Sequence, residues 1–132
     1  MLSVRCLLLP QNQPSPYESD EGQILESLLV QEGFTVRRMG RNHTIEDELG
    51  EVDVIFFEVT SVEDLHQFQQ LRRRSKVPVL LYGSGVPSST WIQGLRAGAD
   101  AFLDLPDRED VVRARLIGFL RRAGLKPYGA RV

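Results

Sequence analysis

Cysteine and long apolar runs are scarce in this 132-residue chain. Its single cysteine, Cys6, excludes an intrachain disulfide framework and a cysteine-based metal cluster, and it favours a reducing compartment. The longest apolar runs, such as Cys6–Leu9 and Val54–Phe57, are far too short to cross a bilayer. The N-terminus also lacks the charged-then-apolar pattern of a signal peptide. We therefore expect a soluble, cytoplasmic protein.

The chain also lacks an excess of one charge and any recognisable catalytic constellation. Its formal net charge is -2, with both signs scattered along the sequence, so no general electrostatic drive toward nucleic acid exists. His43 and His66 stand apart from any cysteine or paired carboxylate at metal-ligand spacing. The hydroxyl run 88–90 lacks the His and Asp arrangement that would activate a nucleophile. These absences predict no enzyme, no metal site, no cofactor, and no direct binding of nucleic acid or membrane.

What the chain does contain is an alternation, repeated five times, of short apolar runs and amphipathic segments. This alternation is typical of βαβ units that feed a parallel sheet. The middle runs do not alternate apolar with polar residues, which indicates strands buried on both faces. We predict a doubly wound α/β fold with a five-stranded parallel sheet and helices on both faces. The predicted strands are Val4–Leu9, Thr35–Arg38, Val54–Phe57, Val79–Tyr82 and Ala101–Leu103.

Five helices are expected between and after these strands, from apolar residues at helical spacing. Ser61 and Asp64 form a capping pair for the third helix, and the second helix has the weakest apolar stripe. We expect one domain over 1–124 and a flexible C-terminal tail over 125–132. The expected helices lie around 24–29, 44–49, 62–71 and 88–97, and after Pro106.

Three segments resemble bacterial response-regulator receivers, the domains that accept phosphate from a histidine kinase. They are LRAGADAFLDLP at Leu95–Pro106, VPVLLYG at Val77–Gly83, and EGFTV at Glu32–Val36. The similarity extends over nearly the whole chain. It implies a CheY-like, flavodoxin-type sheet with strand order 2-1-3-4-5, and a proline that forms a cis peptide after the last strand.

The same resemblance assigns the receiver's phosphorylation site to five positions, none of which keeps its residue. Pro10 and Gln11 match the two carboxylates that hold Mg²⁺, and neither offers a charged oxygen. Glu58 matches the phosphate-accepting Asp, with its carboxylate one methylene further out. Gly83 matches the Thr or Ser that senses the phosphoryl oxygen, and Leu105 matches the Lys that pairs with the acyl phosphate. The resemblance therefore implies a degenerate pseudo-receiver that lacks the phosphoacceptor site.

Two features of this site leave alternatives open. Glu58 is either a fixed mimic of the phosphorylated state or vestigial, and we favour the second because the groups that would read its charge are absent. Glu18, Asp20 and Glu21, in a lengthened first loop, either substitute for the missing acid pair or, as we favour, suit the N-terminus of the next helix. Phe102 matches the family's switch aromatic, and we expect it to serve packing.

The function that follows is phosphorylation-independent protein–protein interaction or homodimerisation in bacterial signalling or transcription regulation. The resemblance implies that helix 88–97, strand 101–103 and the last helix form the contact face. A large aromatic such as Trp91 is equally compatible with the core and with an interface anchor. The alternatives are a phospho-accepting response regulator with a rearranged site and a small-ligand-binding α/β domain. Candidate contacts on the face are Trp91, Arg108, Arg113 and Arg121.

Overall fold

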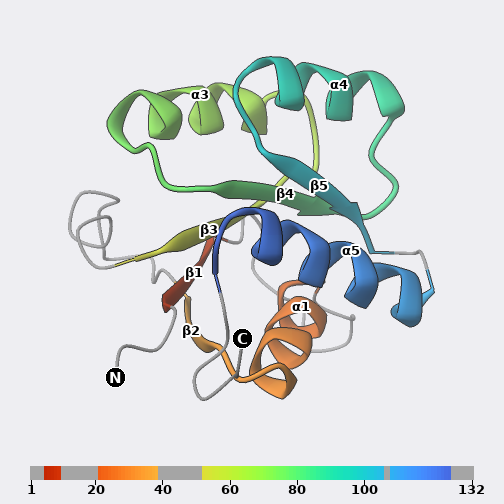
Figure 1. The fold of residues 1–132 in the computed structure, drawn as a ribbon. Coiled ribbons are helices and arrows are strands. Elements are labelled where there is room, and N and C mark those ends of the chain that lie inside the picture. Colours follow the sequence, from red (N-terminus) through yellow and green to blue (C-terminus); the bar gives the residue numbers. More distant parts are fainter. Residues whose placement is uncertain (1–4, 10–20, 39–51, 106–107, 126–132) are drawn as a thin grey trace.

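The computed structural model describes residues 5–9, 21–38, 52–105 and 108–125 (Figure 1). Each predicted strand overlaps a strand of the structure and differs from it by at most one residue at either end. The strands are β1 (Arg5–Leu9), β2 (Thr35–Arg38), β3 (Val54–Glu58), β4 (Val79–Gly83) and β5 (Ala101–Asp104). The helices are α1 (Glu21–Gln31), α3 (Asp64–Arg74), α4 (Ser88–Arg96) and α5 (Glu109–Arg122). The expected second helix at 44–49 lies outside the described residues, as do Pro10, Gln11, Glu18, Asp20, Pro106 and the tail from 126.

The strands form one parallel sheet in the order β2-β1-β3-β4-β5 (Figure 1). β3 pairs with β1 on one side and with β4 on the other. Every residue of β3 and of β4 is buried. Burial on both faces requires continuous apolar runs, which is why these two strands show no alternation in the sequence.

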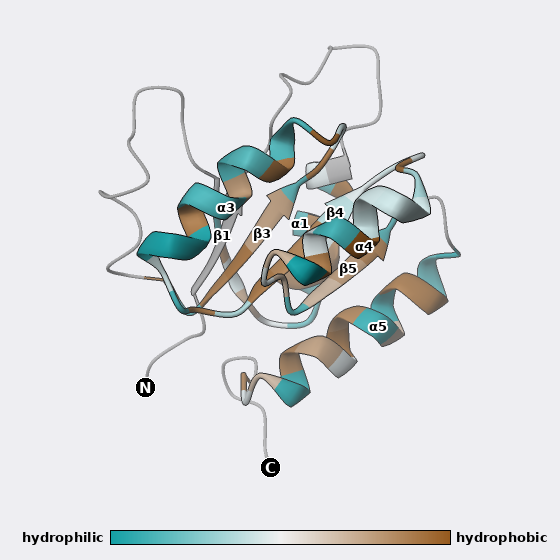
Figure 2. Ribbon diagram, turned by 90° about the horizontal axis from the view of Figure 1, so that it is seen from above, coloured by the Kyte–Doolittle hydropathy of each residue, from teal (hydrophilic) through white to brown (hydrophobic). Residues whose placement is uncertain are grey.

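Helices cover both faces of the sheet, with α1 and α5 on one side and α3 and α4 on the other (Figure 1). Val54 and Phe56 of β3 belong to the core under α1 and α5, and the ring of Phe56 meets that of Phe119 at 6.3 Å. Ile55 and Phe57 belong to the core under α3 and α4. In Figure 2, β3 is almost wholly hydrophobic, whereas α3 is mostly hydrophilic and α5 alternates between the two. The predicted parallel sheet between two helical layers is confirmed.

The connection from β3 to α3 contains one half of the predicted capping pair, because Asp64 reaches back to Ser61 while the N-cap residue, Glu63, makes no side-chain capping bond. The Asp64 carboxylate accepts hydrogen bonds from the Ser61 backbone N–H at 3.2 Å and from the Thr60 N–H at 2.7 Å. These bonds satisfy donors that precede the first turn of the helix. The Ser61 side chain hydrogen-bonds to Glu63 and lowers the pKa of that exposed carboxyl below its ordinary 4.5. These local hydrogen bonds hold the short loop between Glu58 and α3.

None of the helices in the described part of the chain has the length and hydrophobicity that a membrane span requires.

Candidate functional site: the strand ends and the α4–β5–α5 face

The carboxyl ends of β3 and β4 bring two of the five assigned positions to neighbouring strands. Glu58 ends β3 and lies opposite Tyr82, the residue before Gly83 at the end of β4. The Val59 N–H donates to the Tyr82 carbonyl at 2.8 Å, which keeps the chain beyond β3 against β4. Ligands of open α/β sheets bind at this edge. Pro10 and Gln11, the other positions expected here beyond β1, lie outside the described residues.

Glu58 is a buried side chain, with 5% of its surface exposed. Strand alternation places it on the same face as Val54 and Phe56, the face that α1 and α5 cover. A carboxylate in this environment has little contact with solvent, where a small phosphodonor would approach it. The position is therefore built into the interior of the domain.

Gly83 occupies a point at which the structure leaves no room for a side chain. A Cβ atom there would overlap the Val59 carbonyl oxygen, and it would lie 3.0 Å from Val86 Cγ2 and 3.3 Å from Trp91 Cη2. The first of these neighbours is backbone and cannot rotate away. Glycine is therefore required at the position where a receiver carries its phosphate-sensing hydroxyl.

Trp91 fills the space beside Gly83 and stacks on Phe102. The two ring centroids are 4.8 Å apart and the ring planes differ by 13°. Trp91 is 4% exposed and belongs to the core under α3 and α4. Of the two roles left open for Trp91, the structure supports the core, and its assignment as an interface contact is corrected. Phe102, at the switch-aromatic position, has the packing role expected for it.

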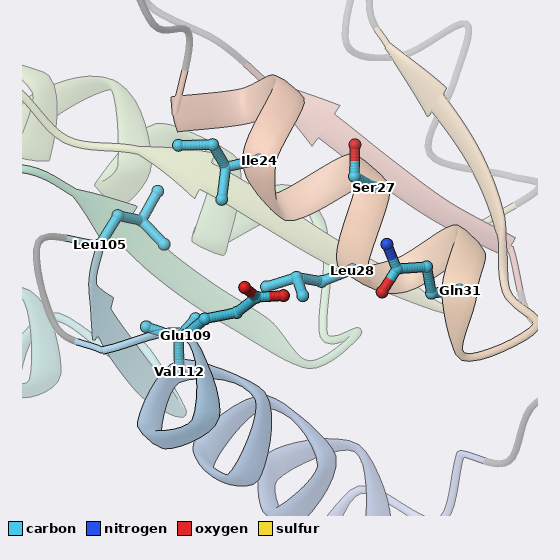
Figure 3. A pocket seen from close by; sticks show the side chains of 7 residues that line it. All are labelled: Ile24, Ser27, Leu28, Gln31, Leu105, Glu109 and Val112. Atoms are coloured by element: carbon cyan, nitrogen blue, oxygen red, sulfur yellow. The ribbon is translucent and has the colours of Figure 1, made fainter.

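Leu105 follows β5, and its side chain makes apolar contacts. Its N–H donates to the Gly83 carbonyl at 2.9 Å, and its side chain packs against the core under α1 and α5. It lines a pocket between those helices, where it lies beside Ile24 at one end while Gln31 lies at the other (Figure 3). The position of the receiver's lysine is thus part of an apolar surface.

A second groove lies on the face made by α4, β5 and α5. Its α5 wall carries Ala114 and Gly118, which fill little of the groove because alanine has only a methyl group and glycine has no side chain. Leu95 of α4 lines the groove and is 40% exposed, and Ile92, three residues earlier on the same side of the helix, is 49% exposed, so this side of α4 carries uncovered apolar surface. The lining residues are Leu80, Leu95, Asp100, Ala101, Phe102, Ala114, Arg115, Gly118 and Arg122.

Of the three arginines expected on this face, one turns toward α1 and the other two are exposed near the ends of α5. Arg113 turns toward α1, where it donates to Gln31 Oε1 at 2.8 Å, so its assignment to the α4 side is corrected. Arg108 precedes α5, is 81% exposed, and pairs with Asp110 at 2.8 Å. Arg121 is exposed in the last turn of α5 and does not line the groove.

Sequence reasoning missed Arg115 and Arg122, the two cations that do line the groove. With Gly118 they follow the helical spacing i, i+3, i+7 and so share one side of α5. That spacing, together with the inward positions Val112 and Leu116, places the two arginines on one flank of α5 but does not say which helix the flank faces.

No protein-family model matches the sequence. Among curated proteins, the transcriptional regulatory protein TctD of Salmonella typhimurium is 32% identical over 104 residues, which are 75% of this chain and 46% of that protein. YrkP of Bacillus subtilis, an uncharacterised transcriptional regulatory protein, is 28% identical over 80% of this chain and 47% of its own length. The chain thus spans about half the length of the curated relatives it matches.

Solved structures decide the fold. The BeF3-activated N-terminal receiver domain of Klebsiella pneumoniae RstA has a TM-score of 0.69 at 18% identity, over 89% of this chain and 98% of that one. The chain has the receiver fold. Within that fold, a pilus assembly-related protein of Burkholderia pseudomallei has a TM-score of 0.69 at 22% identity, over 92% and 89% of the chains. An atypical orphan response regulator, described as having a phosphorylation-independent regulatory mechanism, has a TM-score of 0.62 at 22% identity, over 89% and 96%.

Proposed function

We propose that this chain is a receiver-fold module of bacterial signalling or transcription regulation that acts without phosphorylation, by associating with a second copy of itself through the α4–β5–α5 face. The curated relatives are transcriptional regulatory proteins, which supports the regulatory setting. One structural neighbour is described as having a phosphorylation-independent regulatory mechanism, which supports the proposal. The proposal rests chiefly on the geometry around Gly83.

The proposal depends on one observation, which is that there is no room for a side chain at position 83. A receiver's switch needs a hydroxyl at this position and an aromatic ring that responds to it. Here the backbone carbonyl of Val59 and the ring of Trp91 take the space of any side chain at 83, and Trp91 also holds Phe102 by stacking. Such a pair contributes about 0.5–1.5 kcal/mol beyond the area it buries. The two positions that would move are thus part of one packed unit.

The remaining assigned positions give phosphoryl transfer little support. Catalysis of that reaction is mainly charge neutralisation and in-line positioning by metal and cation. Pro10 and Gln11 bring no carboxylate for Mg²⁺, and Leu105 is packed among apolar side chains where the cation would be. Glu58 offers about one negative charge where an acyl phosphate carries nearly two. We infer that Glu58 is vestigial and not a phosphate mimic.

The α4–β5–α5 groove suits a second copy because it carries charges of both signs. Asp100 lies in the groove with Arg115 and Arg122. A two-fold axis places residue i of one copy against residue j of the other, and j against i, so each acid can meet an arginine of the opposite copy. Such exposed pairs contribute about 0.2–1 kcal/mol each and set register more than affinity. Ile92 and Leu95 supply the apolar surface that association would bury.

The test is intact-mass analysis after incubation with acetyl phosphate and Mg²⁺. The native chain is compared with Glu58→Asp, which restores the shorter acid, and with Glu58→Gln, which removes the charge at constant size. We expect no phosphoryl adduct on any of the three. An adduct on the native chain contradicts the proposal, and Glu18, Asp20 and Glu21 then become the carboxylates to substitute.

A further inference from the structure

Arg72, in the last turn of α3, joins that helix to the beginnings of β4 and β5. Its Nη1 donates to the Val77 carbonyl at 2.6 Å and its Nη2 donates to Asp100 Oδ2 at 3.0 Å. The same Oδ2 atom accepts the Val79 N–H at 2.8 Å. The guanidinium thus uses its planar fork to hold two acceptors in fixed directions, a geometry that the rotating ammonium of a lysine does not impose.

The stem of Arg72 is also held in place. It crosses Gly98, where a Cβ atom would lie 3.2 Å from Arg72 Cγ and 3.3 Å from its Nε. Gly98 has a φ of +113°, a conformation that side chains rarely adopt, so glycine serves both the turn after α4 and this close approach. Only 22% of the Arg72 side chain is exposed, so this arginine packs against the domain and does not extend into solvent.

The hydrogen bond from Arg72 helps to fix the orientation of the Asp100 side chain. Within the described residues, both hydrogen bonds that the Asp100 carboxylate accepts fall on Oδ2, and none falls on Oδ1. The Asp100 side chain is 43% exposed and lines the α4–β5–α5 groove. Oδ2 is therefore engaged with α3 and β4, which leaves Oδ1 as the carboxylate oxygen with which Asp100 can accept a further hydrogen bond.

We propose that Arg72 is a positioning residue for self-association: from α3, outside the contact face, it holds Asp100 in the orientation that meets Arg115 and Arg122 of a second copy. The inference rests on the proposed function. A carboxylate whose rotamer is already fixed loses less conformational freedom when it binds, so the association is stronger than with a free side chain. Without Arg72, Asp100 keeps its charge, and only the hydrogen bond from the Val79 N–H still holds its direction.

The experiment measures the dimer dissociation constant by sedimentation equilibrium in four variants of the full chain. Arg72→Met keeps the stem over Gly98 and removes the guanidinium, Arg72→Lys keeps the charge, and Asp100→Asn keeps an acceptor oxygen and removes the charge. Arg73→Met, at the exposed neighbouring position on the same helix, is the matched control. We expect Arg72→Met and Asp100→Asn to weaken association roughly three- to tenfold. We expect Arg72→Lys to lie between those values and the native one, and Arg73→Met to match the native chain.

A double-mutant cycle separates positioning from a general loss of stability. If Arg72 acts through the Asp100 contact, Arg72→Met has no further effect on dimerisation once Asp100→Asn is present. A purely structural role would lower the melting temperature of Arg72→Met and leave the dissociation constant unchanged, and that result overturns the inference.

The charge variants of α5 show which proposal has failed. If Arg115→Glu and Arg122→Glu weaken the dimer while Arg72→Met does not, positioning is wrong and the contact face stands. If no variant on the face alters association, or the native chain stays monomeric, the contact face itself is wrong and the positioning role falls with it.

Discussion

Adding one methyl group at Gly83 tests how tightly the switch region is packed. In Gly83→Ala the new Cβ overlaps the Val59 carbonyl oxygen and lies 3.0 Å from Val86 Cγ2. Overpacking of this kind costs about 1–3 kcal/mol, and loss of the Trp91–Phe102 stack adds about 0.5–1.5 kcal/mol. We expect a total loss of about 1.5–4.5 kcal/mol, a large fraction of the roughly 5–15 kcal/mol that stabilises a domain.

The assay is urea denaturation with circular dichroism, supported by thermal melts in which we expect Tm to fall by roughly 6–20 °C. Ser84→Ala, at the exposed neighbouring position, is the control and should stay within about 0.5 kcal/mol of the native chain. Adding Trp91→Phe to Gly83→Ala should recover only part of the loss, because the overlap with the Val59 carbonyl remains. A Gly83→Ala variant within about 0.5 kcal/mol of native stability would refute the packing argument.

Three further predictions concern other parts of the domain. Leu105→Lys replaces an apolar contact and should destabilise the domain by about 1 kcal/mol without giving a phosphoryl adduct; gain of an adduct by intact mass would contradict this. Arg122→Glu should raise the dimer dissociation constant about three- to tenfold, whereas Arg121→Glu should not, by sedimentation equilibrium. The lowered pKa of Glu63 makes its ionised form favour the folded state, so this stability is present above pH 4.5 and is lost as pH falls through the lower folded-state pKa. Ser61→Ala should flatten that loss in melts across acidic pH, and an unchanged profile would argue against the Ser61 contact.

The strands were predictable because burial on both faces leaves a local signature. Val54–Phe57 and Val79–Tyr82 are uninterrupted apolar runs, and the structure buries every one of their residues. The capping pair at Ser61 and Asp64 was likewise visible, since it depends on residues three positions apart.

The contact face was harder to predict because it depends on how α5 crosses the sheet. The apolar positions Val112 and Leu116 identify the inner side of the helix, but they do not say which flank meets α1 and which meets α4. Arg113 lies on the α1 flank, and Arg115 and Arg122 lie on the α4 flank. Choosing between the flanks requires the tertiary arrangement.

The position of Trp91 also depended on a distant residue. Trp91 and Ile92 are adjacent on α4, and helical phase alone allows either to be the buried one. Trp91 is buried because Gly83, on β4, presents no side chain where the indole packs. Only the fold brings those two positions together.

The central claim is that the Trp91–Phe102 pair does not rearrange in response to a phosphoryl group, and Trp91 itself reports most directly on it. Trp91 is the only tryptophan in the chain, so its indole N–H gives a single tryptophan signal in a ¹H–¹⁵N spectrum. The spectrum is recorded with and without Mg²⁺ and beryllofluoride, a mimic of the phosphoryl group. We predict no shift of the Trp91 signal and no change in the dimer dissociation constant. A shifted indole signal together with tighter association would contradict the account and show a working phosphorylation switch.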